Sequence, residues 1–312
     1  MIITGGLGFI GSSIAKRLLS EGTRVSIIDD SSTAVRTNVP GADTFKINMM
    51  DHLAIKNINI PAADCVMHLC GPSSGPASAV YPVETLSGGH AITFNALEVA
   101  KKTGTKKFLM ASSMTVYGNT SNREIPVTED QPCNPISYYG ISKFANERLV
   151  EVYCLEHKIE FNNLRLFNVY GPGQKLSRGD QGLVSIFLSL LMKSSNIVSR
   201  GSLERFRDII HIEDVVSAFC LCAETGIRNG PINVGSGMVI TIGELIRKIA
   251  DALNIADQLK VEVCEPVPGD IFGIYADIET LKKATGFNPV YQPADGILQF
   301  ADWARRENQG FT

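Results

Sequence analysis

The stretch Met1–Ser13, MIITGGLGFIGSS, decides the fold of this chain. It reads as a short apolar strand, a turn that contains Gly5, Gly8 and Gly11, and the start of a helix. A dinucleotide pyrophosphate requires bare backbone close to it and helix-start N–H groups that point at its charge. The first glycine permits the tight turn, the second lets the backbone approach, and the third lets the helix pack on the strand. The stretch predicts a dinucleotide-binding turn, although such a pattern alone is a weak signal.

The residues that follow strengthen this interpretation. The helix Ile14–Leu19 comes next, and a second apolar strand, Arg24–Ile28, ends at Asp29, Asp30 and Ser31. A carboxylate about 20 residues beyond such a turn binds the ribose hydroxyls of NAD. Two carboxylates would repel the 2′-phosphate of NADP, so we expect NAD. The alternative is a tight turn followed by a solvated pair of acids.

The composition excludes several classes of protein. The chain has 312 residues and a formal net charge of −3, so it lacks the basic surplus of proteins that bind nucleic acid or anionic membranes. The N-terminus has no signal-peptide pattern, and the apolar run Val184–Met192 is too short to cross a bilayer. The seven cysteines are scattered, and Cys220-x-Cys222 lacks the spacing of a zinc or redox pair. We expect a cytoplasmic protein with reduced thiols and with no metal, nucleic-acid or membrane partner.

Strands and helices alternate through the first half of the chain. Further strands are expected at residues 43–47, 64–69, 107–111 and 161–167, with a helix at 90–102. This alternation predicts an α/β fold built on a doubly wound parallel sheet. After Gly173 the alternation is lost, and a polar loop precedes an apolar helix, Leu183–Lys193. A substrate-binding part is expected to begin there.

The carboxyl ends of the strands bind ligands in a doubly wound sheet. Asp51, with His52 beside it, follows the third strand and is expected to accept from the adenine amine. The small residues after Leu69, Cys70 and Gly71, leave room for the dinucleotide. The alternatives are an ordinary loop acid for Asp51 and a packing role for Cys70.

Two later strand ends face the same crevice. Ser113 follows the strand at 107–111 and can bond a substrate hydroxyl, or it can simply cap a turn. Asn168 follows the strand at 161–167, where its amide can reach a phosphate or the sugar. His68 lies within its strand, which favours a core histidine over a catalytic one.

Tyr139 and Lys143 start the next helix four residues apart, so both face the same side, whereas Tyr138 has no such partner. A phenol with a pKa of about 10 is a poor base at neutral pH. A nearby ammonium and a positive nicotinamide ring stabilise the phenolate and lower that pKa. The pair therefore predicts a general base, although a chance Tyr-x-x-x-Lys on a helix is common.

Two signals mark the second part of the chain. Arg207 is a candidate ligand for a diphosphate, which favours a guanidinium fork, and its alternative is an ion pair with Asp208 or Glu204. Thr241 and Glu244 stand in capping-box positions ahead of the helix expected at residues 242–253.

These motifs together resemble the extended short-chain dehydrogenases/reductases, in the nucleotide-sugar epimerase and dehydratase group. The resemblance covers nearly all of the chain. Its motifs are TGGLGFIGS, the Asp29-Asp30 pair, HLCG (68–71), SSMTVYG (112–118), YYGISK (138–143), RLFNVYGP (165–172), RDIIHIED (207–214), NVGSG (233–237) and PGD (268–270). It implies a Rossmann domain at residues 1–171 and 206–230 that holds NAD, and a smaller α/β C-terminal domain at 172–205 and 231–312 that holds a nucleotide sugar.

Within the group, SSMTVYG is most similar to the UDP-sugar 4-epimerases. The 4,6-dehydratases carry an Asp-Glu pair in this loop, where this chain has Met114 and Thr115. The resemblance implies that Tyr139 takes the proton of the sugar 4-hydroxyl while hydride leaves C4, and that Ser113 bonds the same oxygen. The 4-keto sugar then turns over and takes the hydride back on its other face. Tyr139, Ser113 and Lys143 are the implied catalytic residues.

The resemblance also implies the binding residues. Those expected at the cofactor are Gly5, Gly8, Phe9, Ile10, Gly11, Asp29, Asp30, Ser31, Asp51, His52, Leu69, Cys70, Gly71, Tyr139 and Lys143. Those expected at the substrate are Ser113, Met114, Tyr139, Asn168, Gly182, Leu183, Val198, Arg200, Arg207 and Asp270.

Several residues depart from the group's pattern. Val267 stands where an arginine usually precedes Pro-Gly-Asp, and Gly89 stands where an asparagine contacts the cofactor. Arg200 replaces an aromatic or aliphatic residue near the nucleobase, where it can stack on the base. Arg36 would oppose the preference for NAD if its loop folds back.

The group also implies a homodimer formed through the helices at 90–102 and 145–156. A dehydratase or a 4-ketoreductase on the same scaffold is the alternative activity, and a non-catalytic NAD-binding regulatory protein is the alternative of another class.

Overall fold

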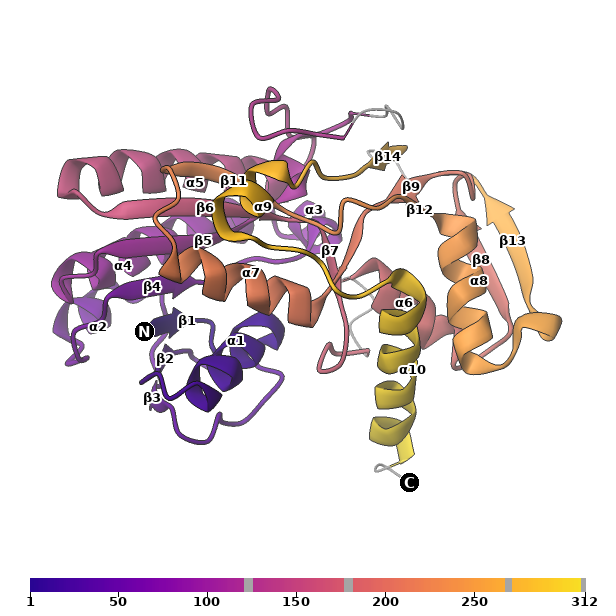
Figure 1. Ribbon diagram of the computed structural model, residues 1–312, viewed down its shortest axis with the longest axis horizontal. Coiled ribbons are helices and arrows are strands. Elements are labelled where there is room, and N and C mark those ends of the chain that lie inside the picture. Colours follow the sequence, from indigo (N-terminus) through magenta and orange to yellow (C-terminus); the bar gives the residue numbers. More distant parts are fainter. Residues whose placement is uncertain (121–125, 177–181, 267–270, 310–312) are drawn as a thin grey trace.

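The computed structural model describes residues 1–120, 126–176, 182–266 and 271–309 (Figure 1). Within them, seven strands form one parallel sheet with the order β3-β2-β1-β4-β5-β6-β11. These strands are β1 (Ile2–Thr4), β2 (Ser26–Ile28), β3 (Asp43–Phe45), β4 (Cys65–His68), β5 (Lys107–Ser113), β6 (Glu160–Leu166) and β11 (Gly230–Val234). The doubly wound parallel sheet expected from the alternating pattern is confirmed.

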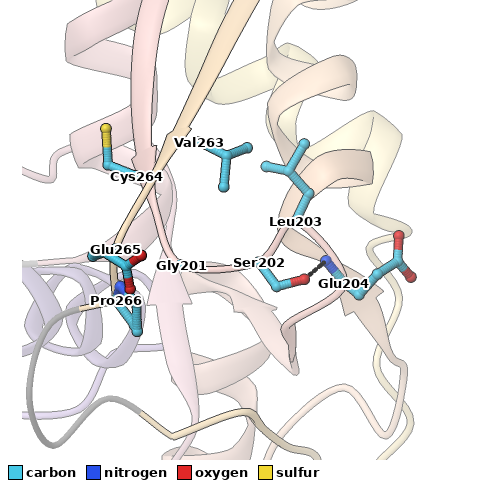
Figure 2. Close-up of a pocket in the computed structure, with 8 residues that line it drawn as sticks. All are labelled: Gly201, Ser202, Leu203, Glu204, Val263, Cys264, Glu265 and Pro266. Atoms are coloured by element: carbon cyan, nitrogen blue, oxygen red, sulfur yellow. Dashed lines mark hydrogen bonds between the residues drawn. The ribbon is translucent and has the colours of Figure 1, made fainter.

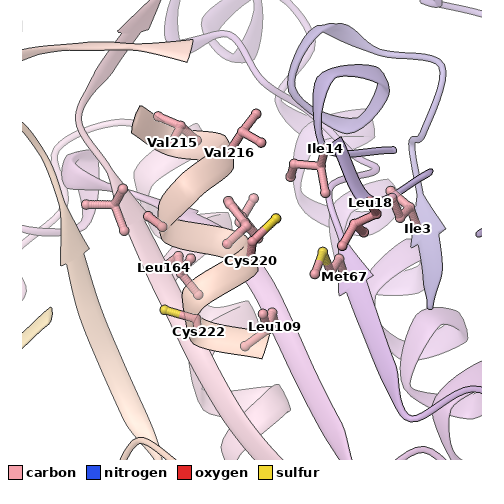
Figure 3. Packing of buried hydrophobic residues seen from close by; sticks show 14 of the residues in the cluster. Ile3, Ile14, Leu18, Met67, Leu109, Leu164, Val215, Val216, Cys220 and Cys222 are labelled. Carbon is pink, nitrogen blue, oxygen red and sulfur yellow. The ribbon is translucent and has the colours of Figure 1, made fainter. Parts of the chain in front are cut away.

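Helices cover both faces of this sheet. The helices on one face are α1 (Phe9–Ser20) and α7 (Ile212–Glu224), and those on the other are α2 (His52–Asn57), α4 (Gly89–Lys102) and α5 (Tyr138–His157). Figure 3 shows Ile14 and Leu18 of α1 beside Ile3 and Met67, and Val215 and Val216 of α7 on the side of Leu164. Burial of apolar side chains on both faces explains why the strands read as near-continuous apolar runs.

The strand order reverses between β1 and β4, and a ligand crevice lies at such a switch point. The turns that follow these two strands meet there, because Leu69 N donates to Thr4 O at 3.0 Å. The glycine turn after β1 therefore lies beside Cys70 and Gly71, as the positions of these residues at strand ends predicted.

A second, smaller unit lies to the right in Figure 1. Its core joins the helices α6 (Leu183–Leu191), α8 (Ile242–Leu253) and α10 (Pro293–Gln309). Its two-stranded parallel sheet pairs β8 (Asn196–Arg200) with β13 (Lys260–Cys264). Strands β9 (Phe206–Arg207), β12 (Ile240–Thr241) and β14 (Gly273–Ile274) form another small sheet, and β7 (Asn168–Tyr170) pairs with β10 (Ile209–His211).

The remaining described elements are short. They are α3 (Gly75–Val80), the π-helical turn η1 (Glu84–Gly88), the 3₁₀ turns η2 (Met114–Val116) and η3 (Ala256–Gln258), and α9 (Glu279–Thr285). The capping box predicted for α8 is confirmed, because Thr241 Oγ1 accepts from Glu244 N and Glu244 Oε2 accepts from Thr241 N.

Helix α1 begins at Phe9, within the stretch Met1–Ser13 that was expected to contain the start of a helix, and β8 was not predicted as a strand. Strand β11 pairs with β6 from Gly230 to Val234, so this strand belongs to the large sheet. The predicted division of the chain into two domains stays a prediction. No helix within the described ranges is long and apolar enough to cross a membrane.

Candidate active site

The glycine turn after β1 has no room for side chains. Gly5 has a φ of +72°, and a Cβ there would lie 2.8 Å from Cys70 N. A Cβ at Gly11 would collide with the carbonyl oxygen of Gly5, which lets α1 lie close to β1. Gly8 is the N-cap of α1 and has no side chain to bond the first-turn N–H groups. The turn and the first residues of α1, Phe9 and Ile10, fit the pyrophosphate of a dinucleotide.

The carboxylate of Asp29 is held against this turn. It is buried, and its two oxygens accept from Leu7 N at 2.9 Å and from Ser31 N at 2.8 Å. Asp30 is less buried and accepts from the backbone and the hydroxyl of Ser32. The fixed carboxylate of Asp29 lies at the end of β2, the position expected for ribose recognition.

The loop that follows folds back over the glycine turn. Arg36 N donates to Leu7 O at 3.3 Å. A Cβ on Gly173 would lie 3.6 Å from the Arg36 guanidinium and 3.7 Å from the Phe9 ring. The guanidinium therefore lies beside the start of α1. The fold-back under which Arg36 was expected to oppose the preference for NAD is thus present.

Asp51 and His52 both make structural contacts. Asp51 is the N-cap of α2, and its Oδ1 accepts from Ala54 N at 2.9 Å. His52 Nδ1 lies 2.7 Å from Asn95 Oδ1. The predicted contacts of these two residues with adenine stay predictions.

All three predicted catalytic residues meet at the end of β5. Tyr139 and Lys143 lie in the first turns of α5, and Lys143 Nζ is 5.8 Å from the centre of the Tyr139 ring. Lys143 Nζ donates to Ala111 O at 2.8 Å. The Ser113 side chain lies near enough to the Tyr139 phenol to oppose the rise in its pKa, and the Ser113 hydroxyl accepts from the Thr115 hydroxyl at 3.0 Å. The three residues therefore form one connected group.

The start of α5 explains why Tyr139, and not Tyr138, joins this group. Ser137 caps the helix by accepting from Gly140 N at 3.1 Å, and Tyr139 N donates to Ser78 Oγ at 3.2 Å. With the helix fixed in this way, Tyr138 is 46% exposed and Tyr139 turns toward Ser113.

Burial controls the protonation of the group. It raises the pKa of Tyr139 above its usual value, and the hydrogen bond with Ser113 opposes this. Burial also lowers the pKa of Lys143 to about 8, while Cys70 and Glu147 oppose the shift. The sequence predicted a lowered tyrosine pKa from the ammonium and the positive nicotinamide ring together, and for the enzyme with its cofactor this stays a prediction.

Two residues near this group are structural. His68 is buried between the hydroxyls of Thr4 and Thr93, and burial lowers its pKa to about 3. Burial raises the pKa of the Cys70 thiol to about 12, so it is neutral at physiological pH. The core histidine and packing cysteine favoured by the sequence agree with these surroundings.

A side chain at position 89 would have no space. A Cβ on Gly89 would lie 2.6 Å from the hydroxyl of Ser142, which donates to Thr85 O. This chain therefore has a glycine where the resembled group usually has an asparagine, and α4 packs closely on α5 at this position.

The predicted substrate residues lie along the boundary between the two units. Asn168 donates to Asp208 O at 2.7 Å and lies 3.7 Å from the sulfur of Met114. Arg207 is buried and donates to the carbonyl oxygens of Phe206 and Phe272.

Asp208 is not the ion-pair partner suggested as an alternative for Arg207. Its carboxylate accepts from the backbone N–H groups of Ser236, Gly237 and Ala276 and from the Ser236 hydroxyl. This leaves the role of Arg207 toward a diphosphate as a prediction.

The other predicted substrate residues lie in the smaller unit. Gly182 and Leu183 form the N-terminus of α6, and Val198 and Arg200 are exposed on β8. Residues 201–204 and 263–266 line an open hollow of about 840 Å³, and none of the catalytic candidates lines it. Figure 2 shows these eight residues. Asp270, like Val267, lies outside the described residues.

The family model described as "NAD dependent epimerase/dehydratase family" matches residues 1–235. The chain belongs to this family. The resemblance seen in the motifs is thereby confirmed, and so is NAD as the cofactor.

Similar proteins come from several sources. A putative UDP-glucose 4-epimerase of Methanocaldococcus jannaschii is 29% identical over 99% of both chains. The structure of a UDP-glucose 4-epimerase of Thermotoga maritima with UDP-glucose superposes with a TM-score of 0.91 at 27% identity, over 98% of this chain and 99% of that one. A Thermus thermophilus UDP-glucose 4-epimerase complex with NAD gives a TM-score of 0.86 at 29% identity, over 97% and 98%.

Two residues of the site, Thr115 and Glu147, were not predicted from the sequence. Thr115 donates to Ser113, and Glu147 lies buried on the same helix as Tyr139 and Lys143. The spacing of four residues from Lys143 to Glu147 is a signal that was present in the sequence.

Proposed function

We propose that this enzyme interconverts the C4 epimers of a nucleotide sugar, with UDP as the nucleotide. The observation that carries the proposal is the connected group of Ser113, Tyr139 and Lys143 beside a turn that fits a dinucleotide. The similarity to UDP-glucose 4-epimerases over nearly the whole chain supports the same activity.

The residues of this chain divide the chemistry among them. When bound, NAD accepts a hydride from C4 and returns it, so that none is consumed. Tyr139 takes the proton from the 4-hydroxyl and later gives it back, while Ser113 bonds the same oxygen. The Lys143 ammonium stabilises the phenolate. Arg207 and the N-terminus of α6 hold the diphosphate, about which the 4-keto sugar turns.

Two residues argue against the alternative dehydratase. The Met114 side chain has no proton to transfer. The Thr115 hydroxyl donates a hydrogen bond to the Ser113 hydroxyl. Removal of water from the sugar requires an acid at this loop, and neither side chain is one. A 4-ketoreductase would use the same three catalytic residues. It differs from an epimerase because it consumes reduced cofactor.

The test is to incubate the purified holoenzyme with UDP-glucose, UDP-N-acetylglucosamine or UDP-glucuronate without added NAD. We expect one of them to equilibrate with its 4-epimer. Release of water from the sugar would support the dehydratase, and net oxidation of added NADH or NADPH would support the reductase. No turnover of any C4 pair would contradict the proposal.

We also propose that the enzyme is a homodimer formed through α4 and α5. These helices pack on each other, and apolar side chains on them are exposed: Phe94, Ile141, Val152 and Leu155. An exposed apolar face of this kind marks an interaction surface. We place the protein in the cytoplasm because all seven cysteines are free thiols.

A further inference from the structure

The catalytic face of α5 continues one turn beyond Lys143. Tyr139, Lys143 and Glu147 are spaced by four residues, so they lie along one face of the helix. Each contacts one of three consecutive residues at the end of β5. Tyr139 meets the Ser113 hydroxyl, Lys143 the Ala111 carbonyl, and Glu147 the Ser112 hydroxyl; these contacts fix the register of helix on strand.

Glu147 is the buried charge of this face. The side chains of Glu147 and Arg165 are both 4% exposed. Arg165 binds the carboxylate through two nitrogens, with Nη2 2.7 Å from Oε2 and Nε 3.0 Å from Oε1. Arg165 also donates to the Tyr117 phenol at 3.1 Å, and its guanidinium lies over the Tyr117 ring. The carboxylate therefore takes part in a buried, two-pronged ion pair and also accepts from the Ser112 hydroxyl.

The groups around Lys143 include few charges. From β4 and its end, His68 and Cys70 face it, and burial keeps both neutral. From its own helix, Tyr139 is a neutral phenol and Glu147 is the carboxylate. On β5, Lys143 contacts the Ala111 carbonyl oxygen. Arg165 of β6 forms its ion pair with Glu147 and not with Lys143. Glu147, one helical turn beyond Lys143 and bonded to the residue next to Ala111 on β5, is thus the carboxylate among these groups.

We propose that Glu147, held by Arg165 and Ser112, is a positioning residue that keeps Lys143 protonated beside Tyr139. The ammonium is the form that stabilises the phenolate, and burial alone favours the neutral amine. Arg165 anchors the carboxylate and balances part of its charge, so removal of Glu147 would leave an unpaired guanidinium that repels the ammonium. The inference rests on the proposed function for its consequence in catalysis, but the protonation of Lys143 is measurable without turnover.

The test follows the titration of the Lys143 ε-carbon by NMR in the holoenzyme, with the signal assigned by its loss in Lys143→Met. Glu147→Gln keeps the shape of the side chain and removes its charge. We expect the pKa of Lys143 to fall by about one unit. The alkaline limb of the kcat/KM profile is expected to move to lower pH by the same amount.

A paired variant covers the case in which Glu147→Gln does not fold. The double variant Glu147→Gln with Arg165→Met removes both charges of the buried ion pair, so neither is left without its partner. We expect a pKa of Lys143 between those of the wild type and Glu147→Gln. Glu147→Asp keeps the charge and is expected to keep the Lys143 titration near that of the wild type, even if it lowers stability.

The control is Glu156→Gln, which removes an exposed carboxylate from the same helix and is expected to shift nothing. A Lys143 titration that is identical in the wild type, Glu147→Gln and the paired variant would overturn the inference. That result would leave the proposed epimerase activity intact, whereas loss of the activity with the expected titration shift would leave the inference intact.

Discussion

At the scale of single residues, Tyr139 is the proposed acceptor of the proton from the sugar 4-hydroxyl. Tyr139→Phe removes the acidic proton and keeps the ring, so we expect kcat to fall by roughly 10²–10⁴-fold. Tyr138→Phe is the matched control, because Tyr138 is adjacent and exposed. Steady-state rates of epimerisation measure both. Full activity in Tyr139→Phe, or an equal loss in both variants, would contradict the assignment.

The protonation of the Lys143 amine is expected to set the pH dependence of the reaction. Burial lowers the pKa of Lys143 from its ordinary value of 10.5 to about 8, so the ammonium is present below pH 8 and is lost above it. Because the ammonium stabilises the Tyr139 phenolate, we expect kcat/KM to decline as the pH rises through about 8. Lys143→Met is expected to be slow at every pH and to lack this alkaline limb. A wild-type profile flat to pH 10 would argue against the ammonium as the active form.

At the scale of elements, the packing of α1 on β1 depends on Gly11. A Cβ there would collide with the carbonyl oxygen of Gly5, so Gly11→Ala must push the helix away from the turn. We expect a loss of roughly 1–3 kcal/mol of unfolding free energy, together with weaker retention of NAD. Gly75→Ala, at the open start of α3, is the control and is expected to change neither. Denaturant unfolding and the NAD content of the purified protein provide the two readouts.

The same scale shows what the sequence predicts and what it misses. The glycine turn, the Asp29 carboxylate and the Tyr139–Lys143 spacing were found because each depends on residues close together in the chain. The partners of Asp208 were not found, since they lie at residues 236, 237 and 276, far from Asp208 in the chain. The pairing of Glu147 with Arg165 joins a helix to a strand and has no local pattern. Strand β8 was missed because it forms only by pairing with the distant β13.

At the scale of the whole molecule, the proposed dimer makes a prediction about α5. Leu155→Glu places a charge on the exposed apolar face of α4 and α5, and burying that charge is costly. We expect sedimentation velocity to show a monomer for this variant and a dimer for the wild type. Leu298→Glu, on α10 in the smaller unit, is the control and should remain dimeric. A monomeric wild type, or dissociation by both variants, would rule out this interface.

The most direct test of the central claim is proton NMR, in D₂O, of whichever of the three UDP sugars the holoenzyme turns over. We predict conversion to the 4-epimer with hydrogen, not deuterium, at C4, because the hydride leaves and returns within one site, and at C5, because no proton is removed there. Deuterium at either carbon, or a product that has lost water, would contradict it.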